Sequence, residues 1–94
     1  MQLESSGERT TTSTAIFGFP FSIGDDPTVM PAGAYVIHTR ERSYTRAHGT
    51  AFIAVSVEVE VQERPGSTSY RVVKPSHFET ALAMDKVRTS SSYR

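Results

Sequence analysis

The residues whose types and spacing could do chemistry gather between positions 40 and 48. Cations alternate there with one aromatic ring, and the set comprises Arg40, Arg42, Tyr44, Arg46 and His48. Guanidinium groups make paired hydrogen bonds to carboxylate or phosphate, and they stack on flat rings. Only Glu41 opposes them in charge within this stretch. These five residues are therefore the candidate interaction surface, for an acidic protein or for nucleic acid.

The overall charge argues against a dedicated nucleic-acid binder. Ten basic and ten acidic residues give a formal net charge of zero. No global field then attracts the chain to nucleic acid or to anionic lipid. The neutral charge favours a solvated loop for the arginine-rich stretch, and nucleic-acid binding is kept as an alternative.

Histidine and cysteine usage predicts no metal and no cofactor. His38, His48 and His77 lack the i, i+4 spacing that places two imidazoles on one helical face. The chain has no cysteine, which excludes disulfides, thiol chemistry and cysteine-based zinc sites. Gly24, Gly33, Gly49 and Gly66 each stand singly at a predicted turn, so no phosphate-binding loop is indicated.

Catalysis is not indicated either, and we expect a protein that is not an enzyme. Asp25 and Asp26 precede a proline, which is typical of a turn. Glu58 and Glu60 share a predicted strand face about 7 Å apart, near the separation of a glycosidase pair. Without a predicted cleft around them, we interpret them as groups that keep a valine-rich strand soluble. No G-x-S-x-G elbow occurs.

The strongest periodic signal spans residues 51–63 and predicts a long strand. Its alternating apolar residues are Ala51, Ile53, Val55, Val57, Val59 and Val61. This face is expected to form the core, while Glu58, Glu60 and Gln62 point to solvent. Phe52 and Ala54 predict burial on both faces in the first half. At ~3.3 Å per residue the strand is about 40 Å long, more than one small sheet needs.

Further strands are predicted at residues 17–23, 34–40 and 70–74. Pro20 has no donor for a ladder hydrogen bond, so the first of them is expected at a sheet edge. Residues 41–50 lack periodicity and are predicted to form an exposed loop. Ser76 and Glu79 have the spacing of a capping box, which predicts a helix over 77–88.

These elements predict one small, mostly β (α+β) domain at residues 15–88. We expect four to five antiparallel strands in a small barrel or roll, with the single C-terminal helix across an open side. Residues 1–14 are predicted to form a polar N-terminal arm, and residues 89–94 a second polar tail. Both termini are thus expected to be polar and extended.

One segment resembles a known pattern. It runs from Phe21 to Val36 and reads FSIGDDPTVMPAGAYV. This is similar to a hairpin motif in uncharacterised small bacterial proteins, where a strand ending in I-G or V-G is followed by L-P-A-G-x-Y. Met30 stands where leucine is usual. The resemblance implies the hairpin topology and no function.

The leading functional hypothesis is a non-enzymatic structural or interaction subunit of a larger protein assembly. Strand pairing and extended termini would engage the neighbours, as homo-oligomer or hetero-assembly, and a viral particle is one such assembly. The alternative is a nucleic-acid-binding β-barrel using residues 40–48. The second alternative is a small ligand-binding or enzymatic roll.

The expected location follows from the lack of apolar runs. No stretch has the ~18 apolar residues of a membrane span, and residues 1–14 do not have the pattern of a secretory signal. We therefore expect a cytoplasmic protein, or part of a particle assembled in the cytoplasm.

Overall fold

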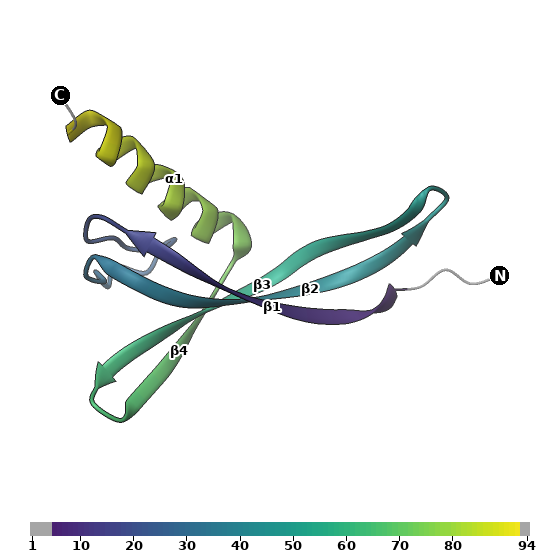
Figure 1. Cartoon of the computed structure of the whole chain (residues 1–94), viewed down its shortest axis with the longest axis horizontal. Helices are drawn as coiled ribbons and strands as arrows, with labels where there is room; N and C mark the ends of the chain where they lie inside the picture. The colour runs from purple at the N-terminus through teal and green to yellow at the C-terminus, as the bar shows by residue number, and fades with distance from the viewer. Residues whose placement is uncertain (1–4, 93–94) are drawn as a thin grey trace.

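A computed structural model describes residues 5–92 as one antiparallel sheet and one helix (Figure 1). The elements are β1 (Ser5–Phe17), β2 (Gly33–Arg46), β3 (Gly49–Arg64), β4 (Ser67–Val73) and α1 (Pro75–Ser92). The strand order in the sheet is the order in the chain, β1-β2-β3-β4. The predicted mostly β fold with a C-terminal helix is confirmed. Within the described residues the sheet is not closed, so "barrel or roll" describes it only loosely.

The polar N-terminal segment forms β1. Threonine is β-branched and suits an extended backbone, although it contributes little apolar surface. β1 pairs with β2 from Ser5↔Tyr44 to Phe17↔Gly33. Residues 5–14 are therefore polar and extended, as expected, but they belong to the sheet. Residues 1–4 of the predicted arm and residues 93–94 of the predicted tail lie outside the described residues.

The predicted strand at residues 17–23 is wrong beyond its first residue. Residues 18–32 form a loop that closes on itself through the antiparallel bridge Phe21↔Met30. The two amide-to-carbonyl hydrogen bonds of this bridge measure 2.9 and 2.7 Å. The alternating apolar residues Phe17, Phe21 and Ile23 still pack in the core, although residues 18–23 do not form a strand. The ring of Phe21 stacks on Phe17 with the centroids 3.6 Å apart.

The predicted loop at residues 41–50 is also wrong. β2 continues to Arg46, the chain turns at Ala47 and His48, and β3 begins at Gly49. Gly49 has φ +125°, a conformation that favours glycine. Residues 41–46 are polar on both faces of the strand, so they show no apolar alternation in the sequence. The backbone of β2 is nevertheless paired with β1 on one side and with β3 on the other.

α1 begins earlier and ends later than predicted. Pro75 is its first residue, a position where the missing amide costs nothing. The amide of Phe78 donates to the Lys74 carbonyl at 3.1 Å, so Ser76 lies inside the first turn and is not the cap. Residues 89–92 of the predicted tail are helical.

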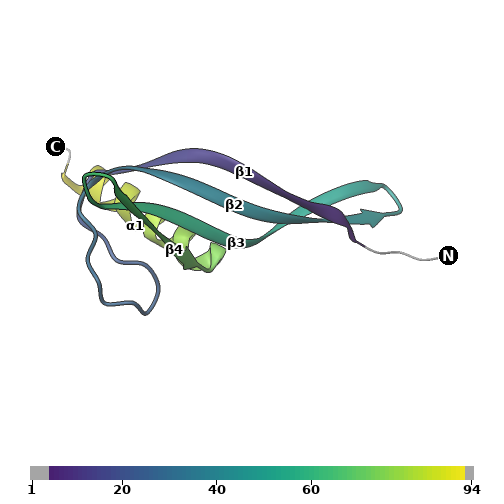
Figure 2. The ribbon, with the colours of Figure 1, turned by 90° about the horizontal axis from the view of Figure 1, so that it is seen from below.

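α1 and the loop of residues 18–32 cover one face of the sheet, at one end only (Figure 2). We call this the helix-side face, and the opposite one the open face. The core between loop, helix and sheet comprises Phe17, Phe21, Ile23, Met30, Ile37, Val57, Val59, Phe78 and Ala81. The β2–β3 hairpin extends from this core away from α1 (Figure 1). Residues 5–10 and 40–56, which form this extension, are here called the distal arm.

Candidate functional site

The distal arm has a free strand edge on β3. β4 pairs with β3 only from Val57↔Val73 to Arg64↔Ser67. After Val73 the chain passes into α1 at Pro75, so β4 cannot follow β3 further. Residues 49–56 are therefore paired with β2 on one side and, among the described residues, with no strand on the other. At ~3.3 Å per residue this edge is about 26 Å long.

Large apolar side chains are exposed beside this edge. Phe52, Ile53 and Val55 are 42%, 45% and 37% exposed, whereas Val57 and Val59 on the same strand are 3% and 0% exposed. The prediction that the first half of this strand is buried on both faces is therefore wrong. Val57 and Val59 belong to the core that α1 covers, and the apolar pattern of β3 continues past that core.

A bulge in β3 changes which residues share a face. The register passes from Arg40↔Ser56 to Glu41↔Ala54, so Val55 is the extra residue. Beyond it Phe52 pairs with Ser43 and lies on the helix-side face, although simple alternation predicts the opposite. The guanidinium of Arg9 lies over the ring, with its Cζ 3.6 Å from the ring centroid. The Nε of Arg9 also donates to Glu41 at 2.6 Å.

The predicted interaction surface is brought together in part. Arg40, Arg42, Tyr44 and Arg46 occupy alternate positions of β2, so they share the open face of the arm. His48 lies in the turn at the tip. Arg42 donates to Glu8 at 3.3 Å. Hydrogen bonding to Tyr44 first, and then to Glu8, raises the pKa of Arg42.

A polar chain that the sequence did not suggest crosses the open face. The Oγ1 of Thr12 lies 3.0 Å from Nδ1 of His38, and Nε2 of His38 lies 2.6 Å from Oε2 of Glu60. The three residues come from three strands and have no recognisable spacing, so only the sheet register could have revealed them. The order hydroxyl, imidazole, carboxylate is that of a hydrolytic triad. However, none of the three lines either of the two hollows found among the described residues.

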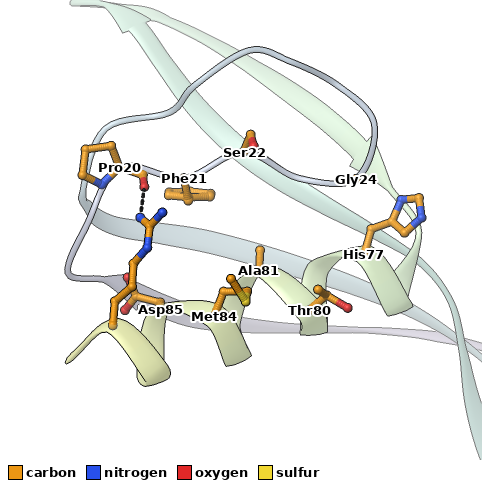
Figure 3. A pocket seen from close by; sticks show the side chains of 10 residues that line it. Pro20, Phe21, Ser22, Gly24, His77, Thr80, Ala81, Met84 and Asp85 are labelled. Carbon is orange, nitrogen blue, oxygen red and sulfur yellow. Dashed lines mark hydrogen bonds between the residues drawn. The ribbon is translucent and has the colours of Figure 1, made fainter. Parts of the chain in front are cut away.

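The first hollow lies between α1 and the loop of residues 18–32 (Figure 3). Its volume is about 270 Å³, just below the usual ~300 Å³ lower bound of ligand pockets. Its polar groups fasten the loop to the helix. The buried carboxylate of Asp85 accepts hydrogen bonds from the amides of Gly18 and Phe19 at 3.0–3.1 Å. Arg88 donates to the carbonyl of Pro20 at 3.1 Å.

The second hollow, of about 450 Å³, lies between the same loop and β4. Asp26 lines it, accepts from the amide of Thr28 at 2.9 Å and pairs with Arg71. These hydrogen bonds, that from the Thr28 amide first, lower the pKa of Asp26 to about 2. In residues 5–92 no three histidine, cysteine, aspartate or glutamate side chains are grouped so that they could hold a metal ion. No helix within that range is both long and apolar enough to cross a membrane.

No protein-family model, curated protein or solved structure that we compared with this chain matches it. Function is therefore argued from the surfaces of the molecule itself.

Proposed function

We propose that this chain is a non-enzymatic interaction subunit of a larger protein assembly, which engages its neighbour by strand pairing at residues 49–56 of β3. The observation that carries the proposal is the free edge of β3 with exposed Phe52, Ile53 and Val55 beside it. Unpaired strand amides and carbonyls form a template for another strand. Added strands gain affinity from main-chain hydrogen bonds, and the alternating side chains give specificity.

The other long edge of the sheet is a weaker candidate. The outer edge of β1 carries exposed threonines together with the charged side chains of Glu8 and Arg9. Charges on an edge strand discourage pairing, and threonine offers little apolar area to bury. Because residues 5–14 are already held by β2, we base the proposal on the β3 edge and not on a free polar arm.

A peptide with the sequence of residues 49–56 tests the proposal. We expect the fluorescein-labelled peptide to bind the full chain in an anisotropy titration, and the amides of residues 49–56 to gain protection from hydrogen exchange. A peptide with the same side chains but N-methylated on alternate amides is the matched control, because it cannot donate to the edge. Equal binding of both peptides would exclude strand pairing, and binding of neither would contradict the proposed function.

Two matched variants locate the bound peptide on the chain. Ile53→Lys places a charge beside the free edge and should abolish binding. Ile16→Lys makes the same change at a side chain that is 72% exposed on β1, away from that edge, and should leave binding unchanged. Loss of binding in both variants, or in neither, would place the peptide elsewhere.

Nucleic-acid binding remains the second candidate because Arg40, Arg42 and Arg46 share one face with Tyr44. Phosphates would bind the cations and a base could stack on the ring. Glu8 already opposes Arg42, which weakens this case. A gel shift of a single-stranded oligonucleotide that falls with salt, and is lost in Arg40→Ala with Arg46→Ala, would support it. A shift insensitive to both would remove it.

A further inference from the structure

We infer that the strand on the free edge of β3 is the same segment of a second copy, so that two chains join about a two-fold axis into one continuous sheet. This inference rests on the proposed strand-pairing function and names its partner. Two-fold contacts are self-complementary, which is the commonest symmetry of soluble oligomers. Three properties of residues 49–56 meet that requirement.

The first property is the length of the edge. It is bounded at one end by the turn at Ala47 and His48, and at the other by the point where β4 begins to pair, Val57↔Val73. In an antiparallel pair of identical segments, the turn of each copy lies beside the end of β4 in the other. A longer strand would collide with Val73 and Lys74. The β2–β3 turn of a second copy ends its strand at about the point where β4 begins to occupy the edge.

The second property is charge. Residues 49–56 read GTAFIAVS and contain no charged side chain. Like charges directly opposite each other destabilise a strand pair, and self-pairing of this segment places none there. The neighbouring part of β3 carries Glu58 and Glu60, but β4 already occupies its edge.

The third property is register. Opposite residues in an antiparallel pair have the same hydrogen-bonding orientation, which alternates along the strand. For two identical segments the axis must therefore pass through a residue. The bulge at Val55 ends the regular alternation, and an axis at Phe52 pairs regular positions over residues 50–54. It sets Phe52 against its copy on the helix-side face, and Ala51 against Ile53 on the open face.

The apolar side chains exposed in one chain thereby cover each other in two. Phe52 and Ile53 are 42% and 45% exposed in the single chain, and both lie at the centre of the pair. Arg9 already covers one side of the Phe52 ring, and in the pair the Phe52 ring of the second copy would cover part of the surface that is still exposed. Close aromatic pairs across strands add stability beyond the area that they bury.

Single cysteine variants report this register directly, because the chain has no cysteine of its own. Cα atoms of opposite residues are about 4.5–5.5 Å apart, within the range that a disulfide spans. We expect Phe52→Cys to form an interchain disulfide on mild oxidation. Ala51→Cys mixed with Ile53→Cys should crosslink more than either variant alone, which tests the register with the phenylalanine kept. Thr12→Cys and Ile16→Cys, both on β1, are the controls and should remain uncrosslinked.

Sedimentation equilibrium of the full chain supplies the second readout. We expect a dimer whose dissociation constant rises about tenfold or more in Ile53→Lys, where a charge would be buried, and stays unchanged in Ile16→Lys. A monomer at all concentrations would overturn the two-fold dimer of full chains, and binding of the 49–56 peptide to that monomer would leave the proposed function intact. A dimer that crosslinks through Thr12→Cys would overturn both. If Ile53→Cys crosslinked efficiently to itself while Phe52→Cys did not, the axis would not pass through Phe52.

Discussion

β3 passes through two regions that use the same kind of sequence differently. One region is the end of the molecule that α1 and the loop of residues 18–32 cover, here called the covered half. There, Val57 and Val59 lie beneath α1 and are 3% and 0% exposed. In the distal arm, Ile53 and Val55 continue the apolar pattern and are 45% and 37% exposed. The strand sequence alone therefore does not decide burial. What decides it is the reach of α1 and of the loop at residues 18–32.

The two regions should also differ in what holds them together. The covered half combines apolar packing with side chains that fasten the loop to the helix. The arm depends on backbone pairing and on exposed contacts such as Arg9 with Glu41 and Phe52. Regions with few buried apolar contacts open locally at low free-energy cost. The arm is thus suited to gain its remaining stability from a partner.

The largest expected difference is between two phenylalanines on the same face of the sheet. Phe17→Ala removes a side chain that is 1% exposed and stacked on Phe21, so we expect a loss of about 3–5 kcal/mol in the free energy of unfolding. Phe52→Ala should cost about 1 kcal/mol or less, mainly the contact with Arg9. Urea unfolding at low protein concentration, where association contributes little, measures both. Equal losses would mean that the arm is as well packed as the core.

A smaller effect is expected from the fastening of the loop. The carboxylate of Asp85 accepts from two backbone amides, and Asp85→Asn replaces one acceptor with a donor that faces them. We expect a loss of about 1–3 kcal/mol, the range for buried hydrogen bonds to a charged group. The amides of Gly18 and Phe19 should exchange faster, while those of the arm do not change.

Asp25→Asn is the control for that variant, because Asp25 is an exposed residue of the same loop. It should alter the free energy of unfolding by less than about 0.5 kcal/mol. If Asp85→Asn were as harmless as Asp25→Asn, packing of Phe21, Ile23 and Met30 would hold the loop without the carboxylate.

The part of the fold that was predictable from the sequence is the part with strong periodicity. Val57 and Val59 in β3 belong to the core, as their alternation indicated. β1 was not predicted as a strand because its threonines bury little, and its pairing with β2 joins residues from 16 (Phe17↔Gly33) to 39 (Ser5↔Tyr44) positions apart. Such non-local pairing leaves no periodic signal.

The candidate site was predictable only in outline. The length predicted for β3 exceeded what one small sheet needs, but the bulge at Val55 moved Phe52 to the other face. A one-residue insertion of this kind shifts every later side chain, and nothing in a single sequence marks it. Likewise, the bonds from Asp85 to Gly18 and Phe19 join residues from opposite ends of the chain.

Within the arm, Arg9→Ala should have a still smaller effect on stability. It removes an exposed ion pair with Glu41 and the cation over Phe52, each worth about 1 kcal/mol or less. We expect faster hydrogen exchange for arm amides and unchanged exchange at the core residues Ile37 and Val59. Arg71→Ala is the matched variant in the covered half, where it should affect the loop instead. If Arg9→Ala slowed exchange in the arm, the guanidinium would be straining the hairpin.

The smallest expected effect is a loss of stability at low pH, and it should arise only in the covered half. Asp26 has a folded pKa of about 2 against an ordinary value of 3.8, because the Thr28 amide and Arg71 stabilise its charged form. A lowered carboxyl pKa contributes stability that is complete above about pH 3.8 and is lost as the pH falls to about 2. Asp26→Asn should therefore unfold at lower urea than the parent chain at pH 5, and the two midpoints should converge near pH 2. A difference that persists unchanged at pH 2 would show that the asparagine acts through packing. In that case the ion pair between Asp26 and Arg71 would not explain a difference in acid sensitivity between this loop and the arm.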